Sequence, residues 1–120
     1  MINLTIPGRL VPHGKLLRMY WRRRTKIKNN LLEEIWAETF DKVNHAEITK
    51  PRRCRLNIMV YQPTRRFDKD NLYASCKLII DALRRLSLIY NDSPKWLDLN
   101  VDQDLDHKNP RIEIEIEEIR

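Results

Sequence analysis

The stretch that most constrains the fold is an amphipathic segment in the middle of the chain. From about Asp70 to Leu86 the apolar residues recur every three or four positions, at Leu72, Cys76, Ile79, Ile80, Leu83 and Leu86. This spacing predicts a helix with one apolar face. Such a helix must bury that face against another element, and a chain of 120 residues has room for one modest core.

The rest of the chain predicts a sheet for this helix to cover. Alternating apolar and polar residues predict strands at Ile2–Ile6, at Cys54 to about Gln62, and in "WLDLNVDQDL" and "RIEIEIEEI". Another helix is expected from Asn29 or Asn30 to about Ala46, and the chain between Pro7 and that helix is expected to be a loop. The order β-α-β-α-β-β predicts one α+β domain over residues 1–120, with helices packed on a mixed sheet.

Charge is distributed unevenly along the chain. Residues 1–60 contain 13 Lys and Arg against 5 Asp and Glu, whereas residues 61–120 contain 10 against 12. A basic half of this kind indicates an acidic partner, usually nucleic acid or an anionic membrane. We expect no membrane-spanning helix and no signal peptide, because no long apolar run is present. Cys54 and Cys76 lack metal-ligand spacing, which favours reduced thiols in a cytoplasmic protein.

The basic residues are densest in "KLLRMYWRRRTKIK", which runs from Lys15 to Lys28. Half of these 14 residues are basic, namely Lys15, Arg18, Arg22, Arg23, Arg24, Lys26 and Lys28. Tyr20 and Trp21 lie among them, and such a stretch can neutralise phosphates and stack on exposed bases. The alternative is a solvated loop whose Trp21 packs inward. We favour contact with DNA, to which Arg65 and Arg66 would contribute.

Two acids, Asp68 and Asp70, stand two positions apart where the amphipathic helix is expected to begin. Carboxylate oxygens are the ligands that Mg²⁺ and Mn²⁺ prefer, so the pair could bind one divalent cation. The alternative is structural, because Asp is a good N-cap and acids are stabilised at a helix N-terminus. The pair alone does not decide between these interpretations.

Further charged residues follow on the same helix and after it. At about 100° per residue, Asp70, Lys77 and Asp81 fall on one stripe of the helix. A lysine on that stripe could act on a phosphate near the acids, or Lys77 and Asp81 could form an ordinary surface ion pair. Asp92 lies in the turn "NDSP" after the helix. We expect this turn to return toward Asp68 and Asp70.

Taken together, "RRFDKDNL", "KLIIDAL" and "NDSPKWL" resemble the RusA family of Holliday-junction resolvases. The resemblance covers about residues 63–97. It implies a small dimeric nuclease in which Asp68, Asp70 and Asp92 are the catalytic, metal-binding acids. It also implies that Lys77 is the catalytic lysine, and that its neighbours on the helix, Asn71 and Asp81, support the site.

The chain departs from the family pattern at a few positions. The shortest family spacing would put Ala74 at the lysine position, whereas the longer spacing, which we adopt, assigns Lys77. Asn91 stands where the family usually has the first Asp of the loop. The N-terminal loop lacks the Asn-containing segment common in the family.

The expected activity is therefore metal-dependent cleavage of DNA. The resemblance implies a homodimer that resolves four-way junctions by paired symmetric nicks, with Mg²⁺ as cofactor and Mn²⁺ as a plausible substitute. Two-fold symmetry suits this task, because a junction has two equivalent strands to cut. Two alternatives remain open, namely a DNA-binding or junction-binding protein without catalysis and a nuclease that acts on other branched DNA.

Overall fold

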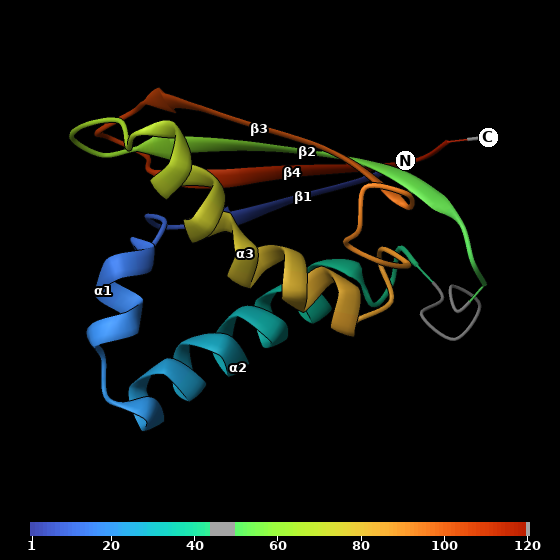
Figure 1. Cartoon of the computed structure of the whole chain (residues 1–120), viewed down its shortest axis with the longest axis horizontal. Helices are drawn as coiled ribbons and strands as arrows, with labels where there is room; N and C mark the ends of the chain where they lie inside the picture. Colours follow the sequence, from blue (N-terminus) through green and yellow to red (C-terminus); the bar gives the residue numbers. More distant parts are fainter. Residues whose placement is uncertain (44–49, 120) are drawn as a thin grey trace.

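The computed structural model describes residues 1–43 and 50–119. In chain order, its elements are β1 (Ile2–Pro7), α1 (His13–Arg18), α2 (Trp21–Thr39), β2 (Arg53–Gln62), α3 (Lys69–Arg85), β3 (Leu97–Leu105) and β4 (Arg111–Ile119). The helices of this described part lie on one face of a four-stranded sheet, as Figure 1 shows. The predicted α+β fold with a mixed sheet is confirmed.

The sheet has the order β1-β4-β2-β3. Strand β4 pairs antiparallel with both β1 and β2, whereas β2 and β3 are parallel. Residues alternate between the two faces of each strand, so β2 directs Leu56, Ile58 and Val60 into the core. Because β2 and β3 are parallel, the connection into α3 and the connection out of α3 lie at opposite ends of the sheet.

The central helix α3 follows the sequence prediction closely. Its start at Lys69 is within one residue of the expected position, and its expected apolar residues are buried up to Leu83, with Leu86 half-buried just after the helix. They pack with the inward residues of the sheet into one cluster. Leu83 is fully buried, so Leu83→Ala would cost about 2–5 kcal/mol of folding stability.

Helix α2 corrects the prediction for the N-terminal half. The stretch Lys15–Lys28 is helical rather than a loop, since it contains most of α1 and the first turns of α2. Half-buried Ile27 lies four residues before Leu31 and eight before buried Ile35, so the apolar stripe of α2 begins earlier than expected. A dense run of charged residues favours the loop interpretation, but Arg and Lys are also good helix formers. Helix α2 ends at Thr39, and Ala46 lies outside the described residues.

Candidate functional site

The two paired acids lie at the N-terminus of α3. Asp68 is the N-cap, and its Oδ1 accepts a hydrogen bond of 2.7 Å from the Asn71 backbone N–H. Asp70 follows in the first turn, and both carboxyl side chains are exposed. The capping interpretation of Asp68 is therefore confirmed. Capping does not prevent cation binding, because an ionised carboxylate has two oxygens with about four acceptor positions.

A glutamine on β3 holds the backbone in front of these acids. The Phe67 N–H donates to Gln103 Oε1 over 3.0 Å, and Gln103 Nε2 donates to the Phe67 carbonyl over 2.7 Å. Buried Gln62 donates from Nε2 to the same Gln103 Oε1 over 3.2 Å. Because Phe67 precedes Asp68, Gln103 fixes the turn that carries the acid pair. Sequence reasoning missed this residue.

The arginines before the acids have different surroundings. The Arg66 Nη2 atom lies 2.9 Å from Asp104 Oδ1 on β3, and both side chains are more than half exposed. A pair this exposed contributes at most about 1 kcal/mol, so Arg66 can exchange its partner for a phosphate at little cost. Arg65 is exposed next to it. Both remain available for contact with an anion near Asp68.

Asp92 lies at the other end of α3. Its Oδ1 is 3.6 Å from Arg84 Nη1, and Arg84 comes 14 residues after Asp70, about 21 Å along the helix axis. The expectation that this turn returns toward the acids is wrong for a single protomer, because the parallel pairing of β2 and β3 forces it to the opposite end of the sheet. Neighbouring Asn91 accepts a 2.9 Å bond from the Ser93 N–H and stabilises the turn.

The described ranges 1–43 and 50–119 contain no group of three or more His, Cys, Asp or Glu residues that could hold a metal ion. One protomer thus presents two acids at one end of α3 and the third at the other.

Lys77 and Asp81 are exposed, and both line a cleft between α2 and α3. The cleft has a volume of about 180 Å³ and is also lined by Arg24 and Lys28 of α2. Ala74, the alternative at the lysine position, is half-buried in the wall of the same cleft. Within the part of the chain that the structure describes, no ion pair joins Lys77 to Asp81, so the surface-pair interpretation is wrong for these two residues.

Asn71 links the acid end of α3 to α1. Its Oδ1 accepts from Ser75 Oγ over 3.3 Å, and Ser75 Oγ accepts from the His13 backbone N–H over 2.9 Å. Ser75 is buried, and His13 is the first residue of α1. This chain of hydrogen bonds holds α1 beside the second turn of α3.

The basic elbow, defined here as residues 13–28, is the surface formed by α1 and the start of α2. Its cationic side chains are exposed except for half-buried Arg24; the exposed ones are Lys15, Arg18, Arg22, Arg23, Lys26 and Lys28. Trp21 is 53% exposed, Tyr20 is 64% exposed, and Arg22 lies 5.3 Å from the Trp21 ring centroid. The alternative that Trp21 packs inward is therefore wrong. The elbow presents an aromatic pair surrounded by positive charge.

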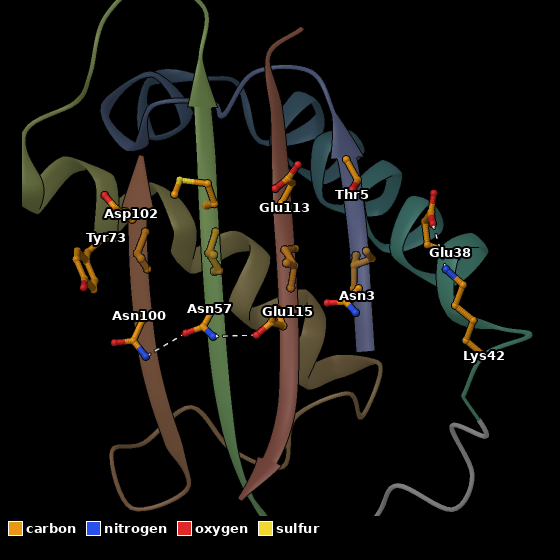
Figure 2. A pocket seen from close by; sticks show the side chains of 15 residues that line it. Asn3, Thr5, Glu38, Lys42, Asn57, Tyr73, Asn100, Asp102, Glu113 and Glu115 are labelled. Carbon is orange, nitrogen blue, oxygen red and sulfur yellow. Dashed lines mark hydrogen bonds and ion pairs between the residues drawn. The ribbon is translucent and has the colours of Figure 1, made fainter. Parts of the chain in front are cut away.

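The open face of the sheet has the opposite character. A hollow of about 660 Å³ lies there, shown in Figure 2. Asn100 donates to Asn57 over 3.1 Å, and Asn57 donates to Glu115 over 3.3 Å. Asp102 and Glu113 add two further carboxylates to the lining. Because these acids repel phosphate, this face of the sheet disfavours binding of a polyanion.

Nucleophilic chemistry by the cysteines is disfavoured by the structure. Burial raises the pKa of the Cys54 thiol, and it raises that of Cys76 to about 12. Both thiols are therefore protonated at neutral pH and unsuited to act as nucleophiles.

Among the described residues, no helix is both long enough and apolar enough to cross a bilayer. Comparison of this chain with protein-family models and with curated proteins finds no match.

Proposed function

We propose that this protein is a metal-dependent, structure-specific endodeoxyribonuclease that resolves four-way DNA junctions, as in the RusA family. The observation that carries the proposal is the position of two exposed carboxylates, Asp68 and Asp70, next to a large basic surface. The bond between His13 and Ser75 holds the basic elbow near them, since Ser75 comes only five residues after Asp70. Phosphate contacts and cation ligands would thus share one end of the helical layer.

The chemistry follows from the groups available. Asp68 and Asp70 would hold Mg²⁺, or Mn²⁺ in its place, because hard cations prefer carboxylate oxygens. When bound, this cation supplies a nucleophilic water at neutral pH and neutralises charge on the phosphate. Lys77, two turns after Asp70, would place its ammonium group on the phosphate that is cut. The basic elbow, Arg65 and Arg66 would bind the flanking phosphates.

The positions of the acids support a homodimer with shared sites. Carboxylate ligands lie about 2.0–2.1 Å from Mg²⁺. Arg84, the partner of Asp92, lies about 21 Å along α3 from Asp70, so the three acids cannot meet on one ion within a protomer. Two copies with antiparallel α3 helices would place Asp92 of one beside Asp68 and Asp70 of the other. A two-fold axis would then create two equivalent sites, as paired nicks require.

A second candidate is a DNA-binding protein without catalysis. It is favoured by the hydrogen bond that makes Asp68 a structural N-cap and by the distance of Asp92 from the acid pair. The two candidates agree on DNA binding by the basic elbow and differ on the role of Asp70.

Asp70→Asn separates these candidates. For the nuclease, nicking of a four-way junction in Mg²⁺ should fall at least a hundredfold, because a metal ligand is lost. Junction binding in Ca²⁺ should persist or tighten, because repulsion of phosphate falls. Asp41→Asn, an exposed acid just after α2, is the matched control and should leave both unchanged. Undiminished nicking by the Asp70 variant at limiting Mg²⁺ would refute the metal assignment.

A further inference from the structure

A continuous groove runs between α2 and α3. The cleft of about 180 Å³ that contains Lys77 is followed by one of about 140 Å³ that contains Arg85. Lys28, Leu78 and Asp81 line both clefts, so the two form one depression, which we call the α2–α3 groove. It begins beside Ala74, one helical turn after Asp70, and ends near the last turn of α3.

The groove has a strong excess of positive charge. Its lining contains the cations Arg24, Lys28, Lys77 and Arg85 and the acid Asp81. In the described ranges, none of these four cations forms a salt bridge. The sheet arginines Arg55 and Arg111, in contrast, are each paired with two carboxylates. Folding gains nothing from gathering unpaired cations in a concavity, whereas a bound anion would compensate them.

The floor of the groove strengthens such an attraction. Leu32, Leu78 and Ala82 line it between the charged side chains. Ala82 is buried, and the two leucines are half-buried. An apolar floor lowers the local dielectric constant, so cations in the groove attract an anion more strongly than isolated surface lysines do.

We propose that the α2–α3 groove binds the phosphodiester backbone of a DNA strand. Lys77 and Arg85 are eight residues apart, or about 12 Å along α3, which is longer than the distance between neighbouring phosphates of one strand. Arg24 and Lys28 stand one turn apart on the opposite wall. In this arrangement Arg85 contacts a phosphate of the strand, whereas its neighbour Arg84 pairs with Asp92.

The inference rests on the proposed function only for the identity of the ligand as DNA. A strand in the groove would run from the Asp70 end of α3 to the Asp92 end. It would therefore pass one half of each of the two shared sites, and the groove would hold the strand between them. Because binding can be measured without cleavage, the groove can be tested apart from nuclease activity.

The test compares two variants that lose equal charge. Arg85→Gln removes an exposed groove cation that lies outside the basic elbow, and the control Lys42→Gln removes an exposed cation beside the acidic hollow of the sheet. Binding of a fluorescent junction and of single-stranded DNA is measured in EDTA at several salt concentrations. The groove variant should show a log–log salt slope shallower by up to roughly 0.9 per protomer on the junction and 0.7 on single strands. The control should keep the wild-type slope.

Each outcome bears on the proposal. Equal slopes for groove variant and control would overturn it, even if the wild-type protein nicks junctions. A slope change in a protein that never nicks would support the groove and refute the nuclease. Titration of wild-type protein with inorganic phosphate, followed by NMR, separates a polymer from a free anion. Saturable phosphate binding in the groove without any change in the DNA slope would overturn the backbone assignment.

Discussion

Gln103 offers a sharp test of how β3 positions the acid pair. Gln103→Ala removes the hydrogen bond from the Phe67 N–H, the bond to the Phe67 carbonyl and the bond from buried Gln62. Each contributes about 1 kcal/mol net, so the loss should be about 3 kcal/mol of unfolding free energy. A small domain has about 5–15 kcal/mol, so the variant should still fold. Its melting temperature should fall by roughly 12 °C, at about 4 °C per kcal/mol.

The effect on activity should be selective. Without Gln103 the turn before Asp68 loses its anchor, so nicking should fall more than tenfold even where the variant is folded. Junction binding in Ca²⁺ should change less than twofold, because most of the proposed phosphate contacts lie on the basic elbow. Gln103→Glu should be intermediate, since a carboxylate still accepts from the Phe67 N–H but cannot donate to the Phe67 carbonyl.

The control lies on the same strand and the same face. Val101→Ala should cost up to about 1.6 kcal/mol, because two partly buried methyl groups are lost and Val101 makes no hydrogen bond to Phe67. Thermal melts and single-turnover nicking at 20 °C below each melting point compare the variants. Equal losses of nicking in the Gln103→Ala and Val101→Ala variants would refute the positioning role.

Two further predictions concern the dimer and the basic elbow. When Asp70→Asn and Asp92→Asn chains are refolded together in equal amounts, a nicking assay should recover roughly a quarter of the wild-type sites. Half of the dimers are then mixed, and each mixed dimer holds one complete site. Sites contained within one protomer would give no recovery. Trp21→Ala should weaken junction binding by about 1–3 kcal/mol in fluorescence titrations, and should weaken binding to linear duplex less, because bases are unstacked at a branch point. Since Trp21 is 53% exposed, the free energy of unfolding of the Trp21→Ala variant should change by less than about 0.5 kcal/mol. A large drop in melting temperature would contradict the position of Trp21 on the surface.

The elements with a clear hydrophobic period were predicted well from sequence. Helix α3 and strand β2 each began within one residue of expectation, because alternation and three-to-four spacing directly report which side chains face the core. Helix α2 begins at Trp21, eight or nine residues before the predicted start at Asn29 or Asn30. Its first turns carry arginines instead of apolar residues, and Tyr20 provides no side-chain cap to mark the start.

Residue positions that depend on strand pairing were not predictable in the same way. The place of Asp92 follows from the parallel pairing of β2 with β3, which the order of elements does not specify. Gln103 did leave a signal, because it is in phase with inward-facing Leu97, Leu99 and Val101. A polar residue at an inward position needs hydrogen-bond partners, and here these partners fix the turn before Asp68.

The most direct test of the account is incubation of the wild-type protein with a synthetic four-way junction in Mg²⁺, Mn²⁺, Ca²⁺ or EDTA. The strands are resolved on a denaturing gel, and flapped and linear duplexes of the same sequence are run in parallel. We expect paired symmetric nicks in the junction with Mg²⁺ or Mn²⁺, binding without nicks in Ca²⁺, and no nicks in EDTA. Faster cutting of the flap would identify a nuclease for other branched DNA. Tight junction binding with no nicks in any metal would contradict the account and leave a DNA-binding protein without catalysis.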